Sequence, residues 1–356
     1  MKTLFATGST KIDFSGKFLS KGGHLLRIFS QTDYKIIDNA GADLLVAFDH
    51  NAKSYQSFIK NGGDPQRAFL IRLEPPAVFP RQYKRPIEEL YFRIFTPGWI
   101  DSGTGQVNLG WVYRYDEDPV NPGESPTRIS DRVEKFSTDQ EVLYEDWSKR
   151  TILLSMVTGN KVSPLNEANY RIRRKIASDL GRDLLDVYGV LWKSSLYAKI
   201  KHRAGVLKFS LLSGHVPNLS NLYGDLFNKY TYTHGQIENK QMVLENSKFS
   251  IVSENSNKYI SEKLFDALIS GTIPLYIGPE LKKSGLPIDI AIQISGESSE
   301  IVKIINTLSE FDIRRILANG KAFLKSEQFL NYWTEESVYK LIAEEIKSSL
   351  SITQTP

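Results

Sequence analysis

Apolar and polar positions along the first half of the chain predict short strands with connecting helices. Apolar runs rich in β-favouring residues occur at 24–30, 43–49, 68–74 and 89–95. Each run is long enough for one buried strand. A helix over 51–60 fits between two of them. This half of the chain is therefore expected to be α/β.

The second half repeats the alternation after a polar stretch that we take as a domain boundary at 148/149. The expected elements are a strand at 151–157, a helix at 167–180, a strand at 184–188, an irregular stretch, a later strand at 291–295, and helices beginning near 297 and 311 and covering 334–349. Strands that alternate with helices predict a parallel sheet.

The clearest pattern lies between residues 248 and 279. An apolar run around Ile251 is followed by a polar turn, and a helix over 258–270 then carries apolar residues at four-residue spacing. Gly271 ends this helix in a position that favours a left-handed residue. A second apolar strand follows at 273–277. Two such strands joined by a helix are expected to be parallel, with a right-handed crossover.

Ligands of α/β proteins gather where a parallel strand ends and the next helix begins. A helix N-terminus also offers unpaired N–H groups and the positive end of a dipole. The turn therefore suits a phosphate with a ribose beside it. The residues placed there are Glu254, Asn255, Tyr259, Glu262 and Lys263.

Each of these residues also has an ordinary structural explanation. Lys263 opposes the usual preference for acidic residues in a first turn, which suggests an anion nearby, but it could simply face solvent. Glu262 could be an acid that favours the dipole. Asn255 could cap the turn, and Tyr259 could pack.

Composition describes an ordinary folded protein of two-domain size. The chain has 356 residues, of which 41% are hydrophobic and 24% charged, and it has no cysteine. Disulfides and thiolate metal sites are therefore excluded. No apolar run reaches the length of a membrane span, and the N-terminus has no signal-peptide pattern. A soluble cytoplasmic protein is the simplest interpretation.

The formal net charge of +4 is too small and too dispersed to predict a nucleic-acid partner. Two basic clusters stand out, at 171–175 and 193–203. Both could be solvated helix faces. The first could instead contact a diphosphate, and the second could favour peripheral contact with an anionic membrane surface.

The stretch KFSIVSENSNKYISEKLFDALISGTIPLYIGP closely resembles the C-terminal motif of glycosyltransferase family ten, the α-1,3/1,4-fucosyltransferases. Residues 235–246 (GQIENKQMVLEN) resemble the segment that precedes this motif. Residues 150–189, with RTILLSMVTGN, YRIRRKIASDLG and LLDVYG, are similar to the entry of the family's donor domain. In the first half only LIRLEPP, at 70–76, resembles a family landmark, and there the family usually has Glu-Ser-Pro.

The resemblance implies a GT-B-like fold, with two Rossmann-like domains facing an interdomain cleft. The expected domains are an acceptor domain (1–148), a donor domain (149–333), a C-terminal helix that packs back on the first domain (334–350) and a frayed tail (351–356). The implied activity is inverting transfer of fucose from GDP-fucose to an oligosaccharide hydroxyl. Animal members of the family carry a membrane anchor that is not seen here, so the chain resembles the bacterial type.

The resemblance also implies roles for individual donor-site residues. Lys263 would contact the donor diphosphate and Glu262 the hydroxyls of the nucleotide sugar, while Asn255 and Tyr259 match other donor-site positions. The family's helical arginine, counted back from Leu180, corresponds to Arg173. Arg171 and Glu254 are kept as alternates.

Glu74 is the candidate general base. It follows an apolar strand and precedes Pro75 and Pro76, so the strand end and the rigid exit hold the carboxylate still. An inverting transfer needs such a group to accept the proton of the acceptor hydroxyl. Arg72, Glu88 and Glu89 are weaker competitors.

A metal-dependent mechanism receives little support from the sequence. Residues 116–118 formally fit a D-x-D motif, but they lie in an acidic loop without a supporting fold pattern. The five histidines show no ligand spacing. We therefore expect no divalent metal requirement and no tightly bound cofactor.

Residues 190–234 depart from the compact members of the family, and their role is open. Two other functions also stay open: a GT-B transferase with a different nucleotide-sugar donor, and a non-catalytic module that binds a glycan or nucleotide. The acceptor, the linkage and the oligomeric state are not indicated.

Overall fold

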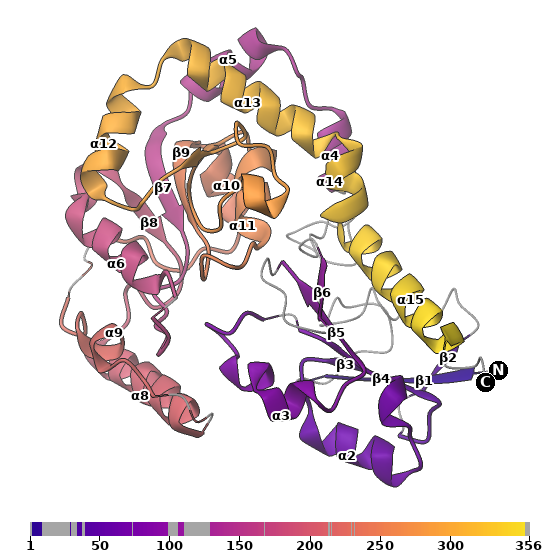
Figure 1. The fold of residues 1–356 in the computed structure, drawn as a ribbon. Helices are drawn as coiled ribbons and strands as arrows, with labels where there is room; N and C mark the ends of the chain where they lie inside the picture. Colours follow the sequence, from indigo (N-terminus) through magenta and orange to yellow (C-terminus); the bar gives the residue numbers. More distant parts are fainter. Residues whose placement is uncertain are drawn as a thin grey trace. The chain divides into compact units, whose positions relative to one another are not determined.

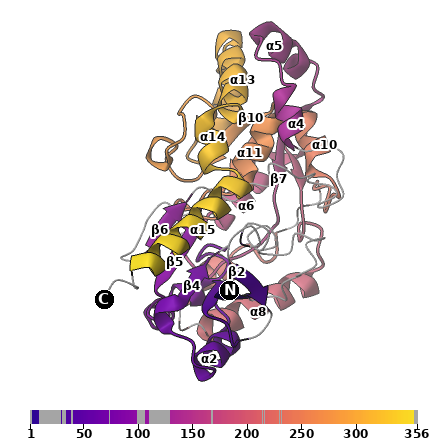
Figure 2. The same cartoon turned by 90° about the vertical axis from the view of Figure 1, so that its right-hand side faces the viewer.

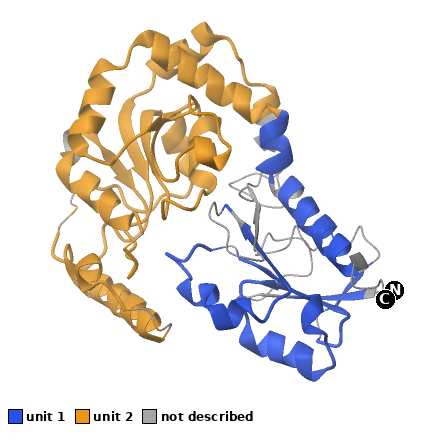
Figure 3. Cartoon of the chain, viewed as in Figure 1, with its two compact units in different colours: residues 1–132, 327–356 blue, residues 133–326 orange. Residues whose placement is uncertain are grey.

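The computed structural model describes residues 2–8, 29, 34–37, 40–72, 74–98, 106–109, 129–166, 168–212, 214, 216–228, 230 and 232–352. Two compact units make up the chain (Figure 3). Unit 1 contains residues 1–132 and 327–356, and unit 2 contains residues 133–326.

Unit 1 is built on a six-stranded sheet in the order β2-β1-β3-β4-β5-β6 (Figure 1). All of its strand pairs are parallel. The strands are β1 (Lys2–Gly8), β2 (Tyr34–Ile37), β3 (Leu44–Phe48), β4 (Ala68–Ile71), β5 (Arg93–Pro97) and β6 (Gln106–Leu109).

Helices cover both faces of this sheet because β3 and β4 are apolar on both sides. Val46 of β3 and Phe69 of β4 share a buried cluster with Ile342 of α15 (Glu335–Ile352). Leu45 joins Phe58 of α2 (Ala52–Lys60) in the cluster on the other face. Fully apolar strands of this kind are typical of parallel sheets with two covered faces. Figure 2 shows α15 running along its side of the sheet.

The remaining helical segments of unit 1 are short. They are η1 (Pro65–Arg67), η2 (Pro80–Tyr83), α3 (Arg85–Glu88) and α14 (Glu327–Tyr332), while α4 (Ile129–Glu134) spans the division between the units. Segment 74–91, which contains η2 and α3, comes soon after β4, and its residues Gln82 and Tyr83 donate hydrogen bonds to the carbonyl oxygen of Glu74.

Unit 2 has a second parallel sheet, with five strands in the order β11-β10-β9-β7-β8. The strands are β7 (Ile152–Val157), β8 (Asp186–Tyr188), β9 (Ser247–Ser253), β10 (Ile273–Ile277) and β11 (Ile292–Gln293). The parallel pairing of β9 with β10 confirms the crossover predicted for residues 248–279.

The helices of unit 2 are α5 (Gln140–Ser148), α6 (Tyr170–Asp179), α7 (Gly181–Leu184), α8 (Leu196–Leu212), α9 (Leu219–Tyr223), α10 (Lys240–Glu245), α11 (Glu262–Ile269), α12 (Ser298–Thr307) and α13 (Glu310–Leu324), with η3 at Lys282–Ser284. Ile176 of α6 and Ile316 of α13 belong to the same buried cluster as Phe249 of β9. Gly271 has a φ of 66° just beyond α11, as predicted.

The division between the units lies before the boundary that the sequence analysis places at 148/149. Helix α5 belongs to unit 2 because its side chains pack there. Arg314 of α13 pairs with Glu141 at 2.7 Å and stacks on Tyr144 with 4.2 Å to the ring centroid. Trp147 packs edge-on against Phe249.

Three sequence expectations need comment. The stretch after β8, expected to be irregular, contains the 17-residue helix α8. Strands β1, β2 and β6 are not predicted by the sequence pattern, because none of them forms a sustained apolar run. The D-x-D match at 116–118 lies outside the described residues, and so does the expected strand at 24–30 apart from Phe29. Phe29 is helical, which contradicts the strand predicted at that position.

Within the described part of the chain, no helix combines the length and the apolar character that crossing a bilayer requires.

Candidate functional site

The candidate site of unit 2 is the turn between β9 and α11, at the carboxyl end of a central strand. Here Ser256 forms single antiparallel bridges with Ala168 and Tyr259. Because these bridges close residues 256–259 into a tight turn, α11 begins at Glu262, four residues later than the sequence predicts. The turn is therefore fixed by pairing with the start of α6 as well as by its own residues.

The side chain of Arg173, on α6, extends to this turn and is 2% exposed. Its Nη2 donates to the carbonyl oxygen of Ser253 at 2.6 Å and to Oδ1 of Asn255 at 3.0 Å, and its Nε donates to Oγ of Ser253 at 3.2 Å. Among the described residues no oxygen accepts a hydrogen bond from its Nη1. The guanidinium therefore braces the turn and retains N–H groups that could meet an anion.

Burial lowers the pKa of Arg173, against the opposing effects of Tyr170 and the carboxylate of Glu254. An arginine remains protonated in such a setting. Its positive charge lies 4.7 Å from the centroid of the Tyr170 ring. A buried cation of this kind is costly unless groups of opposite charge or dipole face it.

Asn255 belongs to the same network. Its side-chain oxygen accepts from Arg173, and its carbonyl oxygen accepts from the backbone N–H of Asn169 at 3.1 Å. Asn169 in turn donates from Nδ2 to Oδ1 of Asn257 at 2.8 Å. These bonds tie the start of α6 to the turn, so Asn255 has a bracing role in addition to the donor contact predicted for it.

Glu254 is fully buried and organises the start of α11. Its Oε1 accepts from the backbone N–H of Ser261 at 3.0 Å, and its Oε2 accepts from Oγ of Ser261 at 2.6 Å. Burial raises the pKa of Glu254, while Lys263 and the hydrogen bonds from Ser261 partly offset this effect. The sequence indicates Glu254 only as an alternate site residue, whereas the structure places it at the centre of the turn.

Lys263 is not an ordinary solvent-facing lysine, since its side chain is 19% exposed. Its Nζ lies 3.5 Å from Oε2 of Glu254 and donates to Oγ of Ser261 at 2.7 Å. The structure therefore gives an internal reason for a cation in this first turn. It also places the ammonium group beside the N-terminus of α11, where an anion would be stabilised.

Glu262 and Tyr259 differ in accessibility. Burial acts to raise the pKa of Glu262, but the positive charges of Lys263 and Lys240 outweigh it, so the pKa lies below its usual value. Glu262 is thus an ionised acceptor on a partly exposed residue. Tyr259 is 2% exposed and packs within the turn.

The floor of the turn is formed by β10 and the residue that follows it. The backbone N–H of Glu254 donates to the carbonyl oxygen of Ile277 at 2.7 Å. A Cβ at Gly278 would lie 2.5 Å from Oη of Tyr276 and 2.9 Å from Cγ of Glu254. Glycine fits here without rearrangement, because a Cβ at these distances would force Tyr276 or Glu254 to shift.

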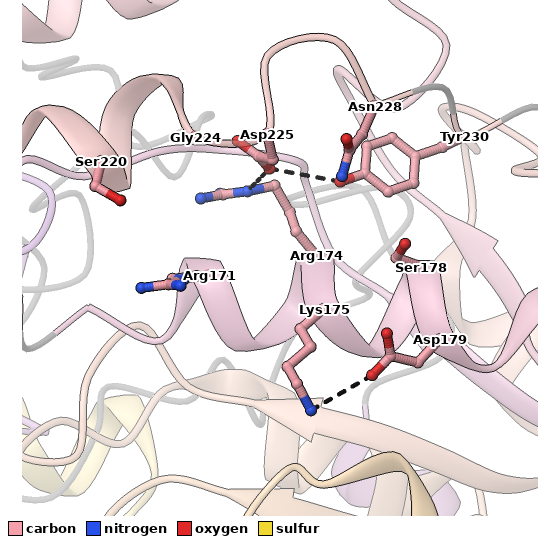
Figure 4. A pocket seen from close by; sticks show the side chains of 10 residues that line it. All are labelled: Arg171, Arg174, Lys175, Ser178, Asp179, Ser220, Gly224, Asp225, Asn228 and Tyr230. Atoms are coloured by element: carbon pink, nitrogen blue, oxygen red, sulfur yellow. Dashed lines mark hydrogen bonds and ion pairs between the residues drawn. The ribbon is translucent and has the colours of Figure 1, made fainter.

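The alternate arginine, Arg171, lies elsewhere. It lines a pocket of about 320 Å³ between α6 and the segment 220–230 (Figure 4). The other lining residues are Arg174, Lys175, Ser178, Asp179, Ser220, Gly224, Asp225, Asn228 and Tyr230. Arg174 pairs with Asp225, and Lys175 lies 3.4 Å from Asp179. The geometry of the turn thus includes Arg173 and not Arg171.

In unit 1, Glu74 follows β4 on a half-buried turn. Its carbonyl oxygen accepts from Oη of Tyr83 at 3.0 Å and from Nε2 of Gln82 at 3.2 Å. Gln82 also donates to Oδ1 of Asp49 at 3.1 Å. These bonds fix the backbone of Glu74 at the carboxyl end of the sheet, as a positioned base requires.

The competitors of Glu74 serve as ion-pair partners. Arg72 is buried and donates to Oε1 of Glu88 at 2.8 Å, with its guanidinium 4.2 Å from the centroid of the Tyr83 ring. Glu89 pairs with Arg85 on the surface at 2.7 Å. These contacts favour structural roles for Arg72, Glu88 and Glu89.

Sequence reasoning missed Asp49. This residue follows β3, is fully buried and has a φ of 56°. A positive φ at a residue other than glycine is uncommon and often marks a functional site. Its position after an apolar strand was visible in the sequence, but its contact with Gln82 was not.

No group of three or more histidine, cysteine, aspartate or glutamate residues that could hold a metal ion is found among the residues that the structure describes.

Solved structures of other proteins are similar to this chain in fold. No protein-family model matches the chain, and no curated protein matches it. Anabaena Alr3699/HepE in complex with UDP and glucose is similar at 11% identity with a TM-score of 0.52, covering 98% of this chain and 100% of the other. An α1,3-fucosyltransferase with GDP is similar at 14% identity with a TM-score of 0.51, covering 98% and 90%.

These identities show similarity of fold. The predicted fold class, α/β with two Rossmann-like units, is confirmed by the two parallel sheets with their helices and by these structures. The chain has the GT-B glycosyltransferase fold.

Proposed function

We propose that this protein is an inverting glycosyltransferase that transfers fucose from GDP-fucose to a hydroxyl of an oligosaccharide. The observation that carries the proposal is the convergence of Arg173, Asn255 and Lys263 on one turn at the start of α11. Two cations beside a helix N-terminus form a suitable site for a diphosphate.

In this proposal Arg173 and Lys263 stabilise the charge that develops on the leaving diphosphate. Fixed cations in a largely buried setting are effective because they need little reorganisation during the reaction. Glu262 accepts hydrogen bonds from hydroxyls of the nucleotide sugar, since its carboxylate is ionised and accessible. Asn255 and Tyr259 shape the pocket beside them.

The chemical step is a single displacement at the anomeric carbon of the sugar. The acceptor oxygen forms the new bond while the bond to the diphosphate oxygen breaks, and the configuration inverts. The acceptor proton passes to the carboxylate of Glu74, and GDP leaves. We propose that no divalent metal takes part, so added chelator should leave the rate unchanged.

Fucose is favoured as the donor sugar by the motif at 248–279, and the fold similarity to an α1,3-fucosyltransferase is consistent with it. The second candidate is a glycosyltransferase with another donor, because Alr3699/HepE has the same fold and is described in complex with UDP-glucose. A non-catalytic binding module would not need a base at position 74.

A donor screen tests the proposal. The melting temperature is measured with GDP-, UDP-, dTDP- and CMP-sugars, followed by an assay for released nucleotide with oligosaccharide acceptors. A ligand at about 100 times its Kd stabilises a protein by about 2.7 kcal/mol, so GDP-fucose should raise the melting temperature by a few degrees. Stabilisation by UDP-sugars alone would support the second candidate, and binding without turnover would support the module.

A further inference from the structure

Helix α8 presents an outward face made of apolar and basic residues. We define the α8 outer face as Tyr197, Lys201, Ala204, Lys208, Leu211 and Leu212. These positions recur every three or four residues and therefore share one side of the helix. Tyr197 is 75% exposed, Leu211 60% and Leu212 75%. Exposed apolar residues gathered along one face indicate a binding surface.

The opposite face attaches α8 to unit 2. Arg203 is buried, lies 3.0 Å from Oδ1 of Asp225 and donates to the carbonyl oxygen of Leu222 at 2.6 Å. Lys199 donates to the carbonyl oxygen of Asn228 at 2.8 Å. The helix is therefore anchored on its inner side, and its outer face is not needed to hold it in place.

The charge of this segment has a single sign. Residues 196–212 contain three lysines and one arginine but no aspartate or glutamate. The nearby carboxylate of Asp225 faces inward, where Arg174 and Arg203 pair with it. No acidic side chain of α8 itself thus offsets Lys201 and Lys208 on the outer face.

We propose that the α8 outer face docks the protein on an anionic lipid surface. Tyrosine and leucine side chains enter the boundary between headgroups and acyl chains, and lysines alongside them are attracted to anionic headgroups. Charge argues against pairing of α8 with a second copy, because the two helices would bring like charges together. The proposal concerns a surface distinct from the β9–α11 turn and does not depend on the donor.

Vesicle co-sedimentation tests this proposal with the full chain. The protein is mixed with vesicles of phosphatidylcholine alone or with phosphatidylglycerol added. Binding is expected only to the anionic vesicles, and high salt should release the protein because surface charges are screened. K201Q/K208Q should lower the partition coefficient at least about tenfold, since each lysine near the surface contributes a several-fold attraction. L211S/L212S should lower it by a similar factor.

Matched controls use residues of similar exposure on other elements. Ile288 is 68% exposed and Phe311 69%, and Lys282 and Lys283 are exposed on η3. I288S/F311S and K282Q/K283Q should bind vesicles as the parent does. GDP-induced stabilisation should be unchanged in every variant. The proposal would be overturned if the protein bound neutral and anionic vesicles equally well, or if the control variants lost as much vesicle binding as the α8 variants. It would also be overturned if the protein formed a dimer that L211S/L212S dissociates.

Discussion

The ammonium group of Lys263 lies 3.5 Å from the buried carboxylate of Glu254, and Ser261 bridges the two by hydrogen bonds. The lysine thus has an internal partner in addition to the diphosphate that we propose for it. A variant of Lys263 therefore changes two properties, the stability of the turn and the affinity for the donor. The two effects can be separated through Glu254.

Replacing Lys263 by Met should destabilise the protein by about 1–2 kcal/mol, because it leaves a buried carboxylate without its cation. In the background of Glu254→Gln the same replacement should cost little, since a neutral amide needs no counter-charge. The measurement is urea unfolding of both single variants and the double variant.

The affinity for GDP should fall at least about tenfold in Lys263→Met with or without Glu254→Gln, because the contact between Lys263 and the diphosphate is lost in both. Calorimetric titration with GDP measures this effect. If Glu254→Gln restores full affinity to the lysine variant, then Lys263 acts only through the structure of the turn.

Replacement of Arg173 should be costly, whereas replacement of Arg171 should have little effect. Arg173→Lys loses the forked contacts to Ser253 and Asn255, so we expect a loss of about 2–3 kcal/mol in stability and weaker GDP binding. Arg171→Lys, on the exposed side of the same helix, should stay within about 0.5 kcal/mol of the parent. Equal loss of GDP affinity in both variants would count against Arg173 as the specific diphosphate contact.

Glu74→Gln should leave GDP binding intact and lower kcat by about 10²–10⁴-fold, as expected when a general base is removed. Steady-state assays with saturating donor give kcat, and titration gives the affinity. Glu89→Gln provides the control, because Glu89 is an exposed partner of Arg85. Normal turnover in Glu74→Gln would place the base elsewhere.

His50 gives unit 1 a predicted pH dependence. Burial, with help from the charge of Arg81, lowers the pKa of His50 below its ordinary value of 6.5. The unfolded chain therefore binds more protons in the window between the folded pKa and 6.5, so stability rises with pH through this window and is lost as the pH falls below 6.5.

His50→Gln should flatten this dependence, as measured by urea unfolding between about pH 5 and 7.5. The hydroxyl of Tyr91 lies 2.9 Å from Nδ1 of His50, so the substitution also removes a hydrogen bond. Tyr91→Phe removes the same bond and keeps the titrating ring. It should retain the slope, and an equally flat profile in Tyr91→Phe would show that the imidazole charge is not the cause.

Local pattern predicted the elements around the turn because apolar periodicity is a local property. The strand around Ile251, the parallel partner at 273–277 and the positive φ of Gly271 all follow from short stretches of sequence. The start of α11 was placed too early, at residue 258. The bridges of Ser256 with Ala168 and Tyr259 delay it, and the bridge to Ala168 is a long-range contact.

Side-chain partners could not be read from spacing. Glu254 was only an alternate because its burial and its bonds to Ser261 depend on how β9 and β10 enclose it. Helix α8 is not predicted because its exposed leucines leave no clear apolar periodicity in the sequence. The positive φ of Asp49 and its contact with Gln82 depend on the folded backbone, which composition does not reveal.

The tight contact of Gly278 with Tyr276 and Glu254 has a consequence for engineering. A library that aims at a new sugar specificity should keep these three positions constant, since a methyl group at 278 would already force Tyr276 or Glu254 to shift. Randomisation is better directed to the partly exposed Glu262 and its surface neighbours Asn257 and Lys258. Library members would then differ in the residues that recognise the sugar while the turn itself keeps its fold.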